Sequence, residues 1–232
     1  MIVSVHQPQY LPWIGYFHKI LKSDAFVFLD CVQYKTREFQ NRNRIRTDKG
    51  WIWLTVPVIT KGKRQQKISE VLIDNSSPWQ RKHILSLETY YRKAEFFERY
   101  YPFFLETYQR SWKRLMELNV HIISYILKEL SINTNIYFES EIGTNSTGTE
   151  RIIQICKKLN AEVYLSGIGG KDYLNEERFK EEGINLVYQD FKHPIYTQQF
   201  MRNKDDFVFN LSIVDLLFNL GPEKSRKLLE SI

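Results

Sequence analysis

The sequence predicts an α/β fold with a mostly parallel sheet, flanking helices and a helical subdomain. Short apolar runs recur along the chain and end abruptly in polar residues, as residues 2–5 do before His6 and residues 25–29 before Asp30. Segments with apolar residues at helical spacing separate these runs, and this alternation is typical of parallel βαβ units. With 232 residues and 43% hydrophobic content, the chain is long enough to bury a full core.

The expected strands, in chain order, are residues 2–5, 25–29, 51–58, 70–73, 136–139, 162–166 and 184–189. Most of the remaining chain is predicted as helix. Ser77 and Pro78 form a helix start, and helical spacing continues to residue 131, with a break or restart at Pro102. This aromatic-rich stretch, 77–131, is predicted as a helical insertion into an α/β core of residues 1–76 and 132–232, with its aromatic side chains packed inside.

Polar and aromatic side chains follow the first predicted strand. They are His6, Gln7, Gln9, Tyr10 and Trp13. The prolines among them stiffen this loop, because each proline fixes its own φ and restricts the residue before it. In open α/β sheets, ligands bind outside the carboxyl ends of the strands. We therefore expect these side chains at a binding crevice, where the amides pair with substrate hydroxyls and the aromatic rings with a sugar face. Hydrogen bonding to the backbone is the alternative for the amides, and packing into the core is the alternative for the aromatic rings.

The second strand end repeats this arrangement. The polar residues that follow residues 25–29 are Asp30, Gln33, Lys35, Asn41, Arg42, Asn43 and Arg44. Arginine forks that alternate with amides suit bidentate recognition of anions and hydroxyl groups. Asp30 is a candidate partner for a substrate amine, and an internal salt bridge is its alternative role. We expect this segment to face the same crevice as the first.

A third strand end opens into a loop rich in glycine. Its candidate ligand-binding residues are Ser166, Gly167, Gly169 and Gly170. Glycines at such a place let backbone amides approach an anion closely. The spacing is neither that of a P-loop nor that of the Rossmann glycine motif, and a plain tight turn is the alternative. His193 follows the last expected strand and is a further candidate.

The net charge of +6 is concentrated in one segment. Residues 35–67 contain ten Lys or Arg and two acids, which gives +8, while the remaining 23 basic and 25 acidic residues give −2. Such a concentrated field attracts a phosphorylated or otherwise anionic partner, and a solvated basic hairpin is the alternative. Nucleic-acid binding would also use this charge, but no recognised motif supports it.

The residue pattern argues against two kinds of catalytic centre. Cys31 and Cys156 have neither a metal-ligand spacing nor a disulfide framework, and we find no close His pair, so no metal is expected. Ser166 does not lie in a nucleophile elbow. Catalysis by positioning and electrostatics fits better, with His6 as a general base or an anion ligand. A structural histidine is the alternative for His6.

Five sequence motifs occur in order along the chain: His-Gln-Pro-Gln-Tyr-Leu-Pro-Trp-Ile-Gly-Tyr-Phe, Phe-Val-Phe-Leu-Asp-Cys-Val-Gln-Tyr, Phe-Gln-Asn-Arg-Asn-Arg-Ile, Trp-Leu-Thr-Val-Pro-Val and Tyr-Leu-Ser-Gly-Ile-Gly-Gly. Together they resemble the WbqC-like family. The resemblance spans nearly the whole chain and implies a role in bacterial O-antigen or other surface-polysaccharide biosynthesis. It also implies transfer of glycine or another acyl group to an amino sugar.

The order of elements is also similar to the nucleotide-binding fold of adenylate-forming ligases such as pantothenate synthetase. Those enzymes activate a carboxylate with ATP and hand it to an amine, so the analogy makes ATP a candidate cofactor. Their paired-histidine signature would need a second histidine where this chain has Gln9. The analogy therefore covers the order of elements and one of the two histidines.

Two classes of function follow. One is an acyl or aminoacyl transferase, or an amide-forming ligase, that acts on a nucleotide-linked amino sugar or another phosphorylated small molecule. The other is a non-catalytic sugar-nucleotide-binding or scaffold protein for polysaccharide assembly. The first apolar run is too short for a signal peptide or a membrane span, which favours a cytoplasmic protein without a membrane span.

Overall fold

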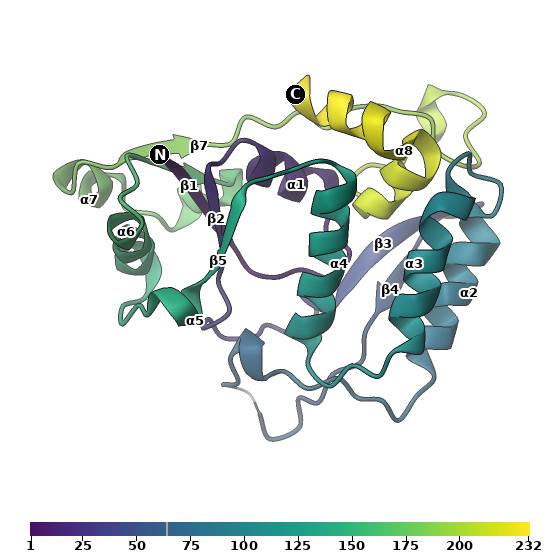
Figure 1. The fold of residues 1–232 in the computed structure, drawn as a ribbon, viewed down its shortest axis with the longest axis horizontal. Coiled ribbons are helices and arrows are strands. Elements are labelled where there is room, and N and C mark those ends of the chain that lie inside the picture. Colours follow the sequence, from purple (N-terminus) through teal and green to yellow (C-terminus); the bar gives the residue numbers. More distant parts are fainter. Residues whose placement is uncertain (64) are drawn as a thin grey trace.

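A five-stranded parallel sheet forms the centre of one half of the molecule in the computed structural model, which describes residues 1–63 and 65–232 (Figure 1). Its strands are β1 (Ile2–His6), β2 (Ala25–Phe28), β5 (Asn135–Phe138), β6 (Val163–Ser166) and β7 (Asn185–Tyr188). They are ordered β5-β2-β1-β6-β7, and each neighbouring pair is parallel. The predicted α/β fold with a parallel sheet and flanking helices is confirmed.

The strand order reverses between β1 and β6. From β1 the chain adds β2 and then β5 on one side, and later β6 and β7 on the other. Such a reversal leaves a crevice at the carboxyl edge, because the connections that follow the two central strands run to opposite sides. His6 ends β1 and Ser166 ends β6, so both residues flank this switch point.

Helices cover both faces of the sheet because side chains alternate along each strand. Val3, Val5 and Val27 pack in one hydrophobic cluster with α6 (Gly148–Lys158) and α7 (Glu176–Glu181). Phe26 and Phe28 belong to a second cluster on the other face, which also contains the apolar residues of α1 (Ile14–Leu21). Short helical segments complete this half, namely α5 (Glu139–Ile142) and the 3-10 turn η2 (Ile168–Asp172).

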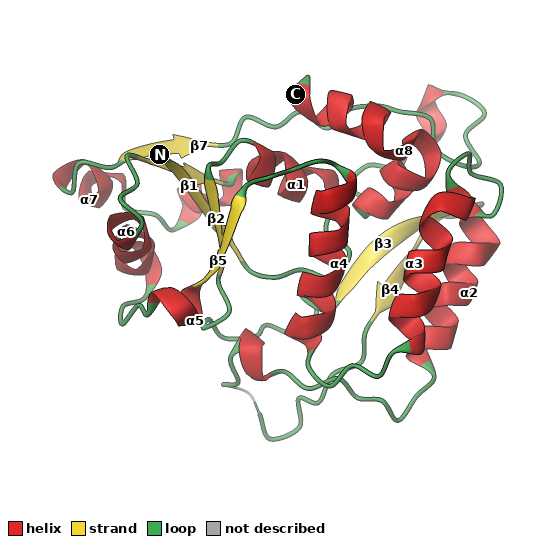
Figure 2. Cartoon of the chain, in the orientation of Figure 1, coloured by secondary structure: helices red, strands yellow, loops and turns green. Residues whose placement is uncertain are grey.

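The other half of the molecule combines helices with a β-hairpin (Figure 2). Its helices are α2 (Trp79–Tyr91), α3 (Phe97–Gln109), α4 (Leu115–Glu129) and α8 (Ile213–Glu230), with 3-10 turns η1 (Ile68–Glu70) and η3 (Lys204–Asp206). The antiparallel hairpin consists of β3 (Arg42–Thr47) and β4 (Gly50–Thr55). All of these helices and the hairpin share the larger hydrophobic cluster with α1. The domain division at residues 77 and 131 stays a prediction.

Three predicted elements differ from the structure. The expected strand 51–58 exists as β4, but it pairs with β3 in the hairpin and not in the parallel sheet. Residues 70–73 make only isolated bridges, at Leu72 and Ile73. The expected break at Pro102 is wrong: α3 continues through it, since Pro102 lies near the start of the helix and removes a single backbone bond, the one to the Glu98 carbonyl. The chain turns instead between α2 and α3.

Part of the basic segment folds as this hairpin, and its Arg64 lies outside the described residues. Across the rest of the chain, no helix combines the length and the apolar character needed to cross a lipid bilayer.

Candidate functional site

A cleft lies at the switch point between β1 and β6. It consists of two adjoining hollows of about 340 and 300 Å³. Both hollows are lined by His6, Lys19, Gly167 and Gly169. One extends to Trp13, Tyr16, Gln189, Asp190 and Phe191, and the other to Gln7, Ser166, Gly170 and Tyr173. Each hollow is large enough for part of a small-molecule ligand.

His6 is the last residue of β1 and is held by its neighbours. Its Nδ1 donates to the Gln7 carbonyl oxygen at 3.1 Å, and its ring packs edge-on against Tyr16 with centroids 5.0 Å apart. Burial, and then the nearby charge of Lys19, lower the pKa of His6 to about 3. The ring is therefore neutral at physiological pH. Because Nδ1 carries the proton for the bond to Gln7, Nε2 has a free lone pair and is a proton acceptor.

Lys19 places an ammonium group at the floor of the cleft. The side chain is 3% exposed, and its Nζ donates to the Val5 carbonyl oxygen at 3.0 Å. Burial lowers the pKa of Lys19 to about 7. The Nζ atom also lies 3.9 Å from the point that a Cβ on Gly167 would occupy, which places it against the glycine loop. A desolvated lysine of this kind binds an anion strongly, since an anion restores the interactions that burial removes.

The glycine loop after β6 is fixed by close packing. Ser166 Oγ donates to the Gly167 carbonyl oxygen at 3.0 Å, and the Ser166 carbonyl oxygen accepts from the Gln189 backbone N–H at 2.7 Å. A Cβ on Gly170 would lie 2.1 Å from Ser166 Oγ and 2.9 Å from Leu174 Cδ1, so this position has no space for a side chain. A Cβ on Gly169 would meet nothing within 4 Å.

The segment after β7 lines the hollow that also contains Trp13. Gln189 Nε2 donates to the Gly15 carbonyl oxygen at 2.9 Å and lies 2.8 Å from His18 Nδ1, which ties this segment to α1. Trp13 packs against Phe191 at 5.0 Å between centroids, and against His193 at 6.5 Å. His193 thus contacts Trp13 but is not among the residues that line the cleft.

Several predicted site residues lie in the interior and make structural hydrogen bonds. Tyr10 is fully buried, and its hydroxyl contacts His83 Nδ1 at 2.7 Å and the Tyr108 hydroxyl at 2.5 Å. Asn41 Nδ2 donates to the Val56 carbonyl oxygen, and Asn43 Nδ2 to that of Leu11. Gln9 is also buried, at 8% exposure, and is not among the residues that line the cleft.

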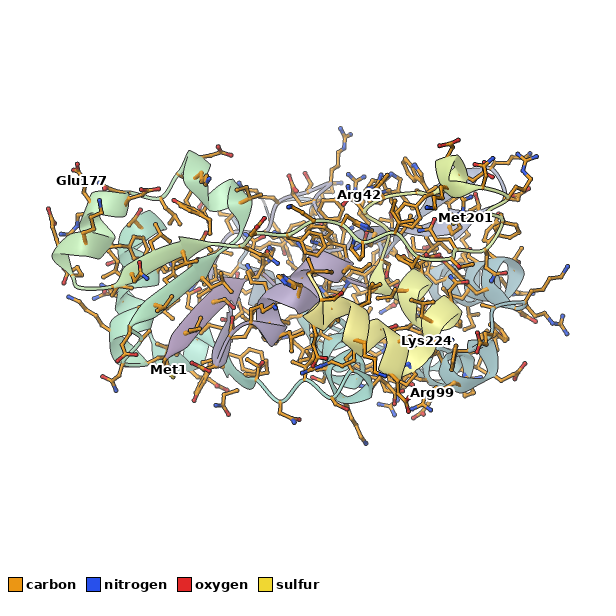
Figure 3. The ribbon with its side chains drawn as sticks, turned by 90° about the horizontal axis from the view of Figure 1, so that it is seen from above. Met1, Arg42, Arg99, Glu177, Met201 and Lys224 are labelled. Carbon is orange, nitrogen blue, oxygen red and sulfur yellow. The ribbon has the colours of Figure 1, made fainter. Side chains whose placement is uncertain are left out.

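Arg42 and Arg44 lie on β3, outside the cleft. Arg42 stacks over Trp53 at 4.2 Å and Arg44 over Trp51 at 4.9 Å, measured from the guanidinium carbon to the ring centroid. Their guanidinium groups donate to the carbonyl oxygens of Arg37 and Asn210. Figure 3 shows Arg42 on the side of the molecule opposite Met1, the residue before β1. The hairpin thus lies on the side toward which β1 runs, but the structure does not bring its arginines to His6.

Other hollows lie away from the switch point, and residues of the basic segment line two of them. Gln33 and Lys35 line one of about 570 Å³ together with residues 60, 63 and 66. A larger hollow of about 930 Å³ is lined, among the described residues, by the loop at 60–66 and by Glu70. None of the described residues that follow directly on the parallel strands lines either hollow. The cleft at the switch point is the stronger candidate for a functional site, because it brings chemically active groups from two strand ends together.

Asp30 follows β2 and lies one strand away from the cleft. Its carboxylate is 1% exposed and accepts from the Ser140 backbone N–H at 3.0 Å. Its neighbours are Cys31 and Glu139, whose ligand atoms lie within 4.8 Å of one another and of Asp30. Neither His6 nor His193 belongs to this group.

Comparison with known proteins gives the chain's family. Residues 7–227 match the WbqC-like protein family. The chain belongs to this family. It is also 34% identical over 223 residues to the uncharacterized protein Rv1507c of Mycobacterium tuberculosis, covering 95% of this chain and 94% of that protein. A search of solved structures gave no significant match.

Lys19 is the main residue of this WbqC-like protein that the sequence interpretation missed. It lies on the predicted first helix between Phe17 and Ile20, both fully buried. A lysine within such an apolar helical stretch was the available signal. Asp190 and Phe191 also line the cleft, whereas the residue that the sequence predicts for this segment is His193.

Proposed function

We propose that this WbqC-like protein transfers an amino acid such as glycine, or another acyl group, to the amine of a nucleotide-linked amino sugar. The observation that carries the proposal is the switch-point cleft, where a buried ammonium group, a neutral imidazole and a glycine loop adjoin. The family resemblance supports a role in surface-polysaccharide biosynthesis. A nucleotide-linked substrate would place the reaction in the cytoplasm.

Lys19 is the proposed contact for the substrate phosphates. The +1 charge of its ammonium lies at 3% exposure, and its one protein hydrogen bond among those described is to a neutral carbonyl oxygen. A phosphate oxygen would supply the charge that this environment lacks. Arg42 and Arg44 were expected in this role, but their stacking on Trp53 and Trp51 keeps them on the hairpin. The proposal therefore places the phosphates on Lys19.

His6 is the proposed general base. A bound phosphate beside Lys19 would favour the protonated imidazole and oppose the effect of burial, so the pKa of His6 would rise in the complex. The sugar amine nitrogen attacks the acyl carbonyl carbon, its proton passes to His6 Nε2, and the leaving group departs with its bonding electrons. Asp190, which lines the cleft, is the proposed partner of the incoming amine before attack.

ATP is the proposed source of activation when the donor is a free amino acid. Its α-phosphate would accept the donor carboxylate, release pyrophosphate and leave an acyl adenylate, from which AMP departs on attack by the amine. A donor that is already activated would need no ATP. The two cases differ in which nucleotides the protein recognises.

A thermal-shift screen with sugar nucleotides and ATP, followed by product analysis, tests the proposal. A ligand at 100 times its dissociation constant stabilises the fold by about 2.7 kcal/mol, which raises the melting temperature by several degrees. We expect stabilisation by nucleotide-linked amino sugars, and an acylated sugar detected by mass spectrometry once a donor is added. Binding without product from any donor, with or without ATP, would instead favour the scaffold function.

A further inference from the structure

A second group of reactive side chains lies at the carboxyl edge of the sheet, beside the cleft. Asp30 follows β2, and Glu139 follows β5, the strand that pairs with β2 in parallel. With Cys31 they form a group whose ligand atoms lie within 4.8 Å of one another. Asp30 and Cys31 follow the strand next to that of His6, since His6 pairs with Phe28 at the end of β2.

This group contains two buried carboxylates, and the cations beside it are Arg151, which pairs with Glu139, and the exposed Lys67, which acts on Cys31. Asp30 and Glu139 are each 1% exposed. Glu139 Oε1 accepts from Thr144 Oγ1 at 2.6 Å and pairs with Arg151 Nε at 3.0 Å. Its other oxygen, Oε2, is buried and has no hydrogen-bond partner among the residues that the structure describes. Leaving a buried carboxylate oxygen unpaired is costly, so the site is incomplete as it stands.

We propose that Asp30, Cys31 and Glu139 bind a divalent cation of the zinc type. Two carboxylate oxygens and one sulfur form a donor set that Zn²⁺ accepts, whereas Mg²⁺ and Ca²⁺ prefer oxygen alone. The +2 charge of the ion and the guanidinium of Arg151 would balance two carboxylates and one thiolate. Three protein ligands leave a fourth tetrahedral position open for water or a ligand.

Cys31 would bind the ion as a thiolate, and its proton would pass to solvent when the metal binds. This inference does not depend on the proposed acyl transfer, because its test reads metal binding and not activity.

The test uses the full chain, stripped of metal by a chelator and titrated with Zn²⁺ by calorimetry and with Co²⁺ by absorption spectroscopy. We expect one Zn²⁺ per chain and a cobalt–thiolate charge-transfer band. Cys31→Ser should abolish the band and weaken Zn²⁺ binding at least tenfold. Cys156→Ala is the matched control, because it removes the other cysteine, which lies in the core on α6, and should leave both signals unchanged.

Three results would overturn the proposal. They are the absence of saturable one-to-one Zn²⁺ binding, equal losses in Cys31→Ser and Cys156→Ala, and a preference for Mg²⁺ that Cys31→Ser does not alter. Asp30→Asn provides a second variant if Cys31→Ser fails to fold. It should also weaken Zn²⁺ binding, since it removes one charged ligand while keeping an acceptor for the Ser140 N–H.

Discussion

The cleft and the hairpin both contain cationic side chains, but they hold them in different ways. Lys19 in the cleft is 3% exposed, and burial lowers its pKa to about 7. Arg42 and Arg44 on the hairpin remain half-buried and stack on Trp53 and Trp51. Each guanidinium stacks on a tryptophan and donates to a backbone carbonyl oxygen, whereas the Lys19 ammonium lies almost fully buried in a cleft with one backbone carbonyl partner. The comparison indicates that a basic residue is a stronger binding candidate where it is buried in a cleft than where basic residues are most numerous.

The largest expected effect is on turnover through His6. His6→Gln keeps a polar side chain of similar size in the cleft but removes the proton acceptor. We expect turnover to fall by roughly 10²–10⁴-fold while substrate affinity stays within about threefold, because general-base catalysis is typically worth that much. Product formation measured by mass spectrometry, beside calorimetric binding, checks this. Unchanged turnover would remove His6 from the mechanism.

The next effect is the pH dependence of binding in the cleft. Lys19 must be protonated to bind phosphate, and its pKa in the free protein is lowered from 10.5 to about 7. Affinity for the sugar nucleotide should therefore fall as pH rises above about 7, by up to tenfold per unit for one required proton. Calorimetry between pH 6 and 9 measures this. An affinity that increases over this range would contradict a phosphate contact by Lys19.

A smaller effect separates two neighbouring glycines of the cleft. Gly170→Ala places a Cβ 2.1 Å from Ser166 Oγ and should destabilise the fold by about 1–3 kcal/mol, as overpacking does. Gly169→Ala is the matched control, since its Cβ meets nothing within 4 Å. Chemical denaturation of both variants measures the difference. Equal stabilities would show that the loop adapts freely.

The smallest effect is expected on the hairpin. Arg42→Ala and Arg44→Ala each remove one cation–π contact, worth about 0.5–1 kcal/mol at a partly exposed site. Stability measured by denaturation should fall by that amount, and sugar-nucleotide affinity should change less than about threefold. A tenfold loss of affinity in either folded variant would extend the binding site to the hairpin.

Local patterns were enough to predict the sheet and two walls of the cleft. Each apolar run that ends in polar residues marks a strand end, so His6 and Ser166 were placed correctly at the ends of β1 and β6. The hairpin was missed at β3 because its sequence is mostly polar. Its extended form depends on pairing with β4 and on stacking with Trp51 and Trp53, which the local sequence does not encode.

Lys19 and Glu139 show why the remaining groups could not be predicted. The burial of Lys19 depends on loops that follow β6 and β7, more than 140 residues further along the chain. Glu139 reaches Asp30 only because β5 pairs with β2, although helices α2, α3 and α4 separate the two strands in the sequence. Both positions result from long-range packing, whereas the sequence interpretation used neighbouring residues.

The most direct test of the central claim compares Lys19→Met with Lys22→Met in calorimetric titrations with a nucleotide-linked amino sugar. Lys22 is exposed at the end of the same helix and serves as the matched control. Loss of a charge-assisted contact, about 1.5–3 kcal/mol, predicts a roughly 10–150-fold weaker affinity for Lys19→Met and no change for Lys22→Met.

The melting temperature of Lys19→Met at pH 7 should also be no lower than that of the wild type. In the wild type, burying the Lys19 charge costs about 1.4 kcal/mol of folding free energy for each unit by which the pKa of Lys19 is lowered, and the variant avoids this cost. Equal affinities of the two lysine variants, with both proteins folded, would contradict the claim that the switch-point cleft binds the substrate phosphates.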